Sequence, residues 1–107
     1  MGSAAIQKIL ADMRLAIDSN KFQFVPRKKN MDTLAKLGLT LQDAKAEIYT
    51  LSEREYRRGP MLDTADYSSD HLWEFKKRVE GEVLYIKFKV LYQEDGSVRL
   101  VSFHIDE

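Results

Sequence analysis

Cysteine is absent from this chain of 107 residues, and only two prolines occur. Without cysteine the protein has no disulfide framework, no thiolate nucleophile and no cysteine-bound metal. The formal net charge is zero, because 17 basic residues balance 17 acidic ones, so no overall field steers the molecule toward nucleic acid or a membrane. Any site for an anion must therefore come from a local cluster of basic side chains.

Long hydrophobic runs are also lacking. No apolar stretch reaches the length of a transmembrane helix, and the N-terminus lacks the basic-then-apolar form of a signal peptide. Together with the missing cysteine, this leads us to expect a cytoplasmic protein that does not bind membranes. Hydrophobic residues make up 44% and charged residues 32%, which is typical of a globular protein, and the length suits one core. We therefore interpret residues 1–107 as a single domain.

The stretch 82–105 alternates between apolar and polar residues and predicts a β-hairpin. Asp95-Gly96 is a strong signal for a two-residue turn. Counting outward from that turn, the apolar pairs are Val90:Val101, Phe88:Phe103 and Ile86:Ile105, and the polar pairs on the opposite face are Lys89:Ser102 and Lys87:His104. A shift of one residue would mix the two faces, so the pattern favours this register.

A third strand over residues 71–78 extends the hairpin if Glu80-Gly81 forms a tight turn. The predicted apolar pairs are Phe75:Ile86 and Trp73:Phe88, and the polar pairs are Glu74:Lys87 and Lys76:Tyr85. Reading across the three strands gives one polar row, Glu74–Lys87–His104. Such a row is either an ordinary solvated sheet face or a functional site.

The N-terminal half predicts helices. One begins with Ser3 as its cap and ends near residues 18–20, a short strand covers 22–25, and a helix capped by Asn30 ends at Gly38. A further helix runs from Thr40 to about residue 51, and Ser52 opens a short helical turn that residues 56–60 end. Residues 61–70 predict a loop. Helices followed by strands indicate an α+β fold, with the helices packed on one face of an antiparallel sheet.

The open sheet face has the groups that metal-free acid–base chemistry requires. His71 and His104 lack an obvious third metal ligand, and no nucleotide-binding or nucleophile-elbow motif occurs. RNA cleavage by its own 2′-hydroxyl needs a proton acceptor, a proton donor and cations around phosphorus. Glu74, Tyr85, Lys87, Lys89 and His104, with Arg57 or Arg58, fit those roles, whereas Trp73 has the parity of the core.

Several short motifs resemble the MqsR family of bacterial type II toxins. They are Leu51-Ser-Glu53, Tyr56-Arg-Arg-Gly-Pro60, Tyr67-Ser68 with Asp70-His71, Trp73-Glu74, Gly81-Glu-Val-Leu-Tyr-Ile-Lys87 and Val101-Ser-Phe-His104. The resemblance implies a RelE-like fold and an mRNA interferase that cleaves single-stranded RNA and is neutralised by a cognate antitoxin. By position, the family's functional residues fall on Arg58, Glu74, Tyr85 and His104, to which the predicted row adds Lys87 as a fifth catalytic candidate.

Two of these positions depart from the best-known member, which has glutamine where Glu74 stands and lysine where His104 stands. A histidine titrates near neutral pH, so the changes alter which group carries a proton. The candidate RNA-binding residues are Tyr56, Arg57, Lys76, Lys89, Arg27 and Lys28. We expect no metal or other cofactor. The alternative function is that of an inactive relative, whose sheet face binds another protein and acts in regulation.

Overall fold

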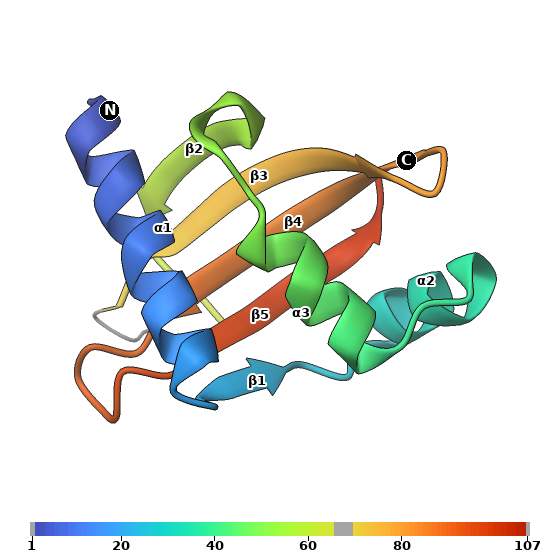
Figure 1. Ribbon diagram of the computed structural model, residues 1–107, viewed down its shortest axis with the longest axis horizontal. Helices are drawn as coiled ribbons and strands as arrows, with labels where there is room; N and C mark the ends of the chain where they lie inside the picture. The colour runs from blue at the N-terminus through green and yellow to red at the C-terminus, as the bar shows by residue number, and fades with distance from the viewer. Residues whose placement is uncertain (1, 66–69, 107) are drawn as a thin grey trace.

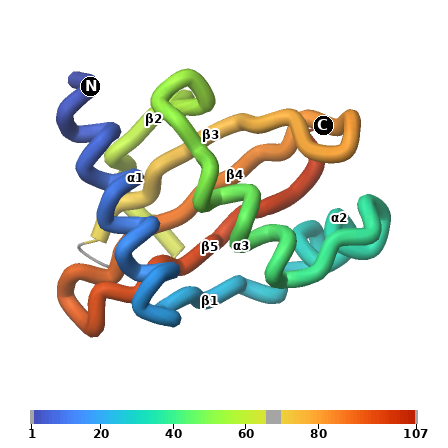
Figure 2. Tube along the Cα trace, in the orientation of Figure 1, coloured from blue at the N-terminus to red at the C-terminus, as the bar shows by residue number. Residues whose placement is uncertain are grey.

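A computed structural model describes residues 2–65 and 70–106. It contains three α-helices, a short 3-10 helix and a single five-stranded sheet with the strand order β1-β5-β4-β3-β2 (Figures 1 and 2). The elements are α1 (Ser3–Asp18), β1 (Phe22–Phe24), α2 (Lys28–Leu37), α3 (Leu41–Tyr49), the 3-10 helix Glu53–Glu55, β2 (Tyr56–Met61), β3 (Leu72–Val79), β4 (Glu82–Val90) and β5 (Val98–Ile105).

The core lies between one face of the sheet and the two helices α1 and α3, which cross that face in Figure 1. Helical spacing places Ile6, Leu10 and Met13 of α1 on the inward side, where they pack against the aromatic side chains of the sheet. Those aromatic residues include Phe75, Phe88 and Phe103. The predicted α+β class and the one-sided helical layer are confirmed.

The sheet is mixed rather than purely antiparallel. β1 pairs with β5 in parallel, with Phe22 opposite Val98 and Phe24 opposite Leu100, whereas the other pairs are antiparallel. The remaining backbone edge of β5 is met by side chains of α2. Asn30 accepts from the Phe103 amide at 2.9 Å, and Thr33 accepts from the Ile105 amide at 3.1 Å. Polar side chains thus take the place of a neighbouring strand.

Two helix starts differ from the sequence prediction. Gly2 occupies the N-cap of α1, and Ser3 instead donates from its hydroxyl to Glu53. α2 begins at Lys28 with Arg27 as its N-cap, three residues earlier than predicted, and Asn30 is a buried residue of its first turn. A short polar side chain at a helix start is typical of a cap, but here tertiary hydrogen bonds to β5 determine its role. The capping box of Thr40 with Asp43 is confirmed.

The predicted register of β3 and β4 is confirmed. Trp73 lies opposite Phe88, Phe75 opposite Ile86, and Glu74 opposite Lys87. Trp73 is buried, as its parity indicates. The tight turn at Glu80-Gly81 keeps this register because both residues adopt positive φ.

The predicted register of β4 and β5 is wrong. Tyr85, rather than Lys87, lies opposite His104, and Lys87 lies opposite Ser102. A bulge at Val101 then shifts the pairing, so that Phe88 faces Leu100 and Val90 faces Val98. The connection is longer than two residues, since β4 ends at Val90 and β5 begins at Val98, and the Leu91 amide donates to the Ser97 carbonyl across its base. Because the bulge inserts one extra residue, Leu100 and Phe103 both point into the core although they are three positions apart.

Residues 56–61 form the edge strand β2 rather than the end of a helical turn. Pro60 is compatible with an edge strand, where a residue that lacks an amide hydrogen need not donate to a neighbouring strand on both sides. Gly59 has φ 136°, and a Cβ there would lie 3.0 Å from the Leu72 carbonyl oxygen and the Trp73 Cα. The close approach of β2 to β3 therefore requires glycine, and it places Arg58 directly opposite Glu74.

The connection from β2 to β3 begins on the polar face of the sheet. Asp63 is buried and accepts from the Lys89 ammonium at 2.8 Å, and the Lys89 side chain is fully buried. Part of the loop predicted over 61–70, residues 66–69, lies outside the described residues. Within the described part of the chain, no helix is long and apolar enough to span a membrane.

Candidate functional site

A chain of hydrogen bonds joins three strands on the sheet face opposite α1 and α3. The Arg58 Nε of β2 donates to the Glu74 Oε1 of β3 at 3.0 Å, and the Tyr85 hydroxyl of β4 donates to the same oxygen at 2.6 Å. The residue Glu74 is 6% exposed, whereas Arg58 lies on the surface. Glu74 therefore holds both the guanidinium and the phenol in fixed positions.

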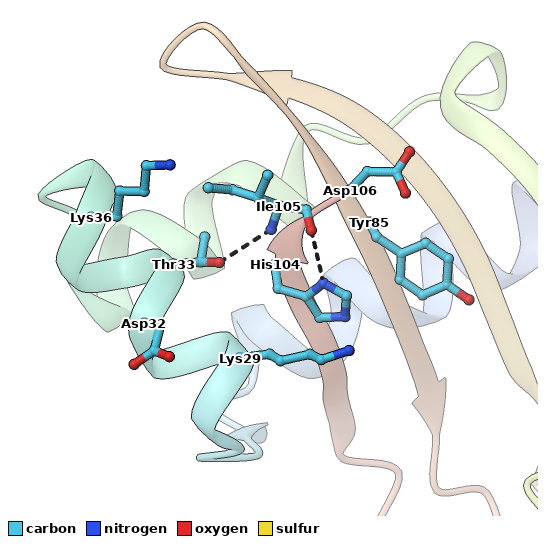
Figure 3. Close-up of a pocket in the computed structure, with 8 residues that line it drawn as sticks. All are labelled: Lys29, Asp32, Thr33, Lys36, Tyr85, His104, Ile105 and Asp106. Carbon is cyan, nitrogen blue, oxygen red and sulfur yellow. Dashed lines mark hydrogen bonds between the residues drawn. The ribbon is translucent and has the colours of Figure 1, made fainter.

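His104 and Lys87 complete the cluster around the Tyr85 ring. The imidazole stacks on the ring, with centroids 5.4 Å apart and an interplanar angle of 19°. Figure 3 shows the two side chains next to one another on β4 and β5. The Lys87 Nζ lies 5.2 Å from the centroid of the same phenol ring. The predicted row is thus altered in register, yet Glu74, Tyr85, Lys87 and His104 still converge because Tyr85 stands between them.

The charged groups of the cluster shift one another's pKa values. Burial by itself would raise the pKa of Glu74, but hydrogen bonds from Tyr85 and Arg58 and the positive charges of Arg58 and Lys87 lower it below its usual value. The hydrogen bond to Glu74 is also the main reason that the pKa of Arg58 is raised. Glu74 is therefore an ionised acceptor whose Oε1 already has two donors, which makes it a weak proton acceptor on its own.

The local backbone determines which nitrogen of His104 exchanges a proton. Nδ1 lies 3.2 Å from the Ile105 carbonyl oxygen, as Figure 3 shows. Because a carbonyl oxygen accepts but cannot donate, we assign the ring proton to Nδ1. Nε2 is then the ring nitrogen that has no hydrogen in the neutral tautomer and is open to a substrate proton. This is the arrangement that a general acid or base requires.

A pocket of about 370 Å³ adjoins the Tyr85–His104 pair. Its wall on the α2 side consists of Lys29, Asp32, Thr33 and Lys36, which Figure 3 places on neighbouring turns of that helix. None of these four residues was predicted from the sequence to belong to the site. Their spacing of three and four positions, which puts them on one helix face, was the available signal. What the spacing did not indicate is that this face turns toward the C-terminal end of β5.

The candidate RNA-binding residues have different environments. Arg57 is exposed, whereas Lys76 pairs with Asp106 at 2.9 Å beside the pocket. Arg27 donates to Ser102 Oγ at 3.0 Å, and Lys28 pairs with Asp32 at 2.6 Å on the surface.

Two of the candidates face inward. Tyr56 donates to the Gly59 carbonyl and packs edge-on against Phe75. Its ring therefore contacts the core in this structure. The prediction that Lys89 contacts RNA is wrong, because its side chain is fully buried against Asp63. The connection after β2, which the alternating pattern does not reveal, supplies Asp63 as the buried partner of Lys89.

The arrangement brings together a titratable imidazole, a phenol held by a carboxylate, and two exposed or half-exposed cations. These groups can donate and accept protons and stabilise an anion. Among the described residues, no group of three or more histidine and acidic side chains has the proximity to hold a metal ion.

Comparison with known proteins gives one result of wide coverage. The family model described as "Motility quorum-sensing regulator, toxin of MqsA" matches residues 7–105, which is nearly the whole chain. No curated protein matches the sequence. The match includes every residue of the cluster on the open sheet face. The chain therefore belongs to the MqsR family of toxins, which act within toxin–antitoxin systems.

Proposed function

We propose that this toxin is an endoribonuclease, an mRNA interferase that cleaves single-stranded RNA by acid–base catalysis without a metal. The observation that carries the proposal is the Arg58–Glu74–Tyr85 hydrogen-bond chain, which ends against a stacked histidine at the edge of a pocket. The membership of this chain in a toxin family supports a cognate antitoxin as its partner. Because mRNA is translated in the cytoplasm, we propose that the protein acts there.

The proposed reaction is an attack of the RNA 2′-hydroxyl on the adjacent phosphorus. The bond from O2′ to phosphorus forms, the bond from phosphorus to O5′ breaks, and the products are a 2′,3′-cyclic phosphate and a 5′-hydroxyl. One proton leaves O2′ and one joins O5′. Negative charge accumulates on the phosphoryl oxygens in between, where Arg58 and Lys87 supply the opposite charge.

The geometry suggests a role for each remaining group. His104, as imidazolium, donates from Nε2 to O5′. The Tyr85 oxygen accepts the proton of O2′ while its own proton passes to the Glu74 Oε1 that it already contacts at 2.6 Å. Glu74 thus acts through Tyr85 rather than directly on the 2′-hydroxyl. The reverse assignment, in which His104 accepts first, uses the same contacts and gives the same products.

The test is cleavage of single-stranded RNA by purified protein in the presence of a chelator. We expect products with 2′,3′-cyclic phosphate and 5′-hydroxyl ends. His104→Ala should lose about two to four orders of magnitude in rate, as is typical of a lost general acid, with unchanged melting because this side chain is only half buried. Products with 5′-phosphate ends, or activity abolished by the chelator, would contradict the mechanism.

Induced expression in a bacterium separates the enzyme from the alternative binding module. Growth arrest that His104→Ala relieves supports the nuclease. Harmless expression of the parent, together with no cleavage in vitro, favours a relative that binds another protein through the same sheet face. The antitoxin is tested directly by whether co-expression of the neighbouring gene restores growth.

A further inference from the structure

The pocket beside His104 is lined by two lysines that form no ion pair with its carboxylates. Lys29 and Lys36 both line it from α2, and within the described residues neither forms an ion pair or a side-chain hydrogen bond. In Figure 3 the Lys29 side chain extends toward the imidazole, and Lys36 lies two turns further along the helix. Two ammonium groups beside a cationic catalytic cluster favour a ligand that brings negative charge.

The carboxylates of the pocket do not cancel this charge, because each already has another partner. Asp32 pairs with Lys28 at 2.6 Å, and Asp106 pairs with Lys76 at 2.9 Å. Neither partner lysine is among the pocket-lining residues. The charges of the lining residues alone sum to zero, but once Lys28 and Lys76 are counted with their carboxylates, the local excess is the positive charge of Lys29 and Lys36, before any protonation of His104.

The helix that carries these lysines is firmly attached to the sheet. Asn30 accepts from the Phe103 amide and donates to the Val25 and Val101 carbonyls, and Thr33 accepts from the Ile105 amide. Both side chains are buried. Seven residues separate the two lysines, which corresponds to about 10 Å along the helix axis. Their positions relative to His104 are thus largely fixed before any ligand binds.

We propose that the pocket is the binding subsite for the nucleotide next to the scissile phosphate, and that Lys29 and Lys36 bind backbone phosphates of the single-stranded RNA. The inference rests on the proposed function, because the pocket shares Tyr85 and His104 with the reacting cluster. An RNA strand whose scissile phosphate lies at that cluster continues into the pocket on one side. The volume of about 370 Å³ lies within the range of pockets that hold small ligands.

The test measures binding separately from cleavage. The probe is a single-stranded RNA of mixed sequence with 2′-O-methyl groups, which lacks the attacking hydroxyl. Its Kd is measured at several salt concentrations for the parent, Lys29→Ala and Lys36→Ala. Lys45→Ala is the matched control, because it removes the same charge from α3 on the opposite side of the sheet. Melting curves confirm that each variant folds.

We expect each pocket variant to weaken binding and to reduce the slope of log K against log salt by about 0.7, the contribution of one single-strand phosphate. Lys45→Ala should keep the slope of the parent. With cleavable RNA, the pocket variants should raise KM and keep kcat within a few-fold, since they bind the strand and take no part in proton transfer.

The outcomes distinguish the subsite from the nuclease. If the parent cleaves RNA but both pocket variants bind with its Kd and slope, the subsite is disproved and the nuclease stands. If the parent cleaves nothing yet the slopes change as expected, the binding of RNA phosphates by Lys29 and Lys36 stands, whereas the nuclease, and with it the position beside a scissile phosphate, is disproved. A parent that does not bind the RNA, or binds only another protein, overturns the subsite.

Discussion

Glu74 shows how one buried carboxylate organises neighbours that the sequence separates by more than ten residues. It accepts from Arg58 and from Tyr85 through the same oxygen, and its burial makes both contacts more valuable than they would be in water. A glutamine at this position still offers a carbonyl oxygen to both donors but has no charge. Substitution there therefore changes the electrostatics of the cluster more than its geometry.

Replacing Glu74 by glutamine should make stability less dependent on acid. The folded-state pKa of Glu74 lies below its ordinary value of 4.5, so the folded protein binds fewer protons than the unfolded chain around that pH. The resulting stability is present above pH 4.5 and is lost as the pH falls through the folded-state pKa. Urea unfolding of Glu74→Gln at pH 7 and at successively lower pH should show a smaller loss than the parent.

The control for this measurement is Glu94→Gln, which removes a carboxylate from the exposed turn before β5. It should retain the acid dependence of the parent. Equal acid dependence in the parent and Glu74→Gln would mean that Arg58 and Tyr85 do not lower the pKa of this carboxyl group.

At the scale of elements, the bulge in β5 determines which residues enter the core. The alternating pattern placed Val101 inside and Leu100 outside, whereas the bulge buries Leu100 completely and leaves Val101 half exposed. Phe103 is buried in both registers, so its substitution does not distinguish them. Substitutions of Leu100 and Val101, by contrast, distinguish the two registers.

Leu100→Ala should destabilise the protein by about 2–5 kcal/mol, because it leaves a cavity beneath α1 and α3. Val101→Ala should cost much less, since the side chain is only partly removed from water. Chemical denaturation of the two variants gives both values. A larger loss for Val101→Ala would favour the register expected from the two-residue turn and would contradict the bulge.

At the scale of the whole molecule, a neutral chain concentrates its charges locally. Basic groups meet the open face at Arg58, Lys87 and the pocket, while Lys89 turns inward to Asp63. That buried pair ties the start of the connection between β2 and β3 to the middle strand of the sheet. It therefore belongs to the stability of the fold rather than to the binding of RNA.

Lys89→Met should destabilise the protein by about 3–5 kcal/mol, because the Asp63 carboxylate remains buried without its cation. The double variant Lys89→Met with Asp63→Leu should recover part of that loss, since the Asp63 carboxylate is then no longer buried without its cation. Thermal or urea unfolding measures both. Unchanged stability in the single variant would show that the carboxylate reaches water without its partner, and Lys87→Met on the same strand is the surface control.

The sequence by itself determined the class of the fold, the register of β3 with β4, the core parity of Trp73 and Phe75, and the candidate cluster. These features depend on interactions that are local or that repeat with the period of a strand or helix. The hairpin turn at Glu80-Gly81 transmits its register directly to the pairs beside it, so Glu74 opposite Lys87 followed from the pattern.

Tertiary structure alone decided the remaining features. The parallel pairing of β1 depends on backbone hydrogen bonds between segments more than 70 residues apart, such as that from the Val25 amide to the Leu100 carbonyl. The bulge at Val101 and the wider turn before β5 depend on the pairing of β4 with β5, which the alternating pattern alone does not determine. The inward position of Lys89 and the approach of α2 to His104 depend on Asp63 and Asn30, whose partners no local pattern identifies. Burial of a polar side chain is favourable only when a distant partner satisfies it, and that condition is met only in the folded chain.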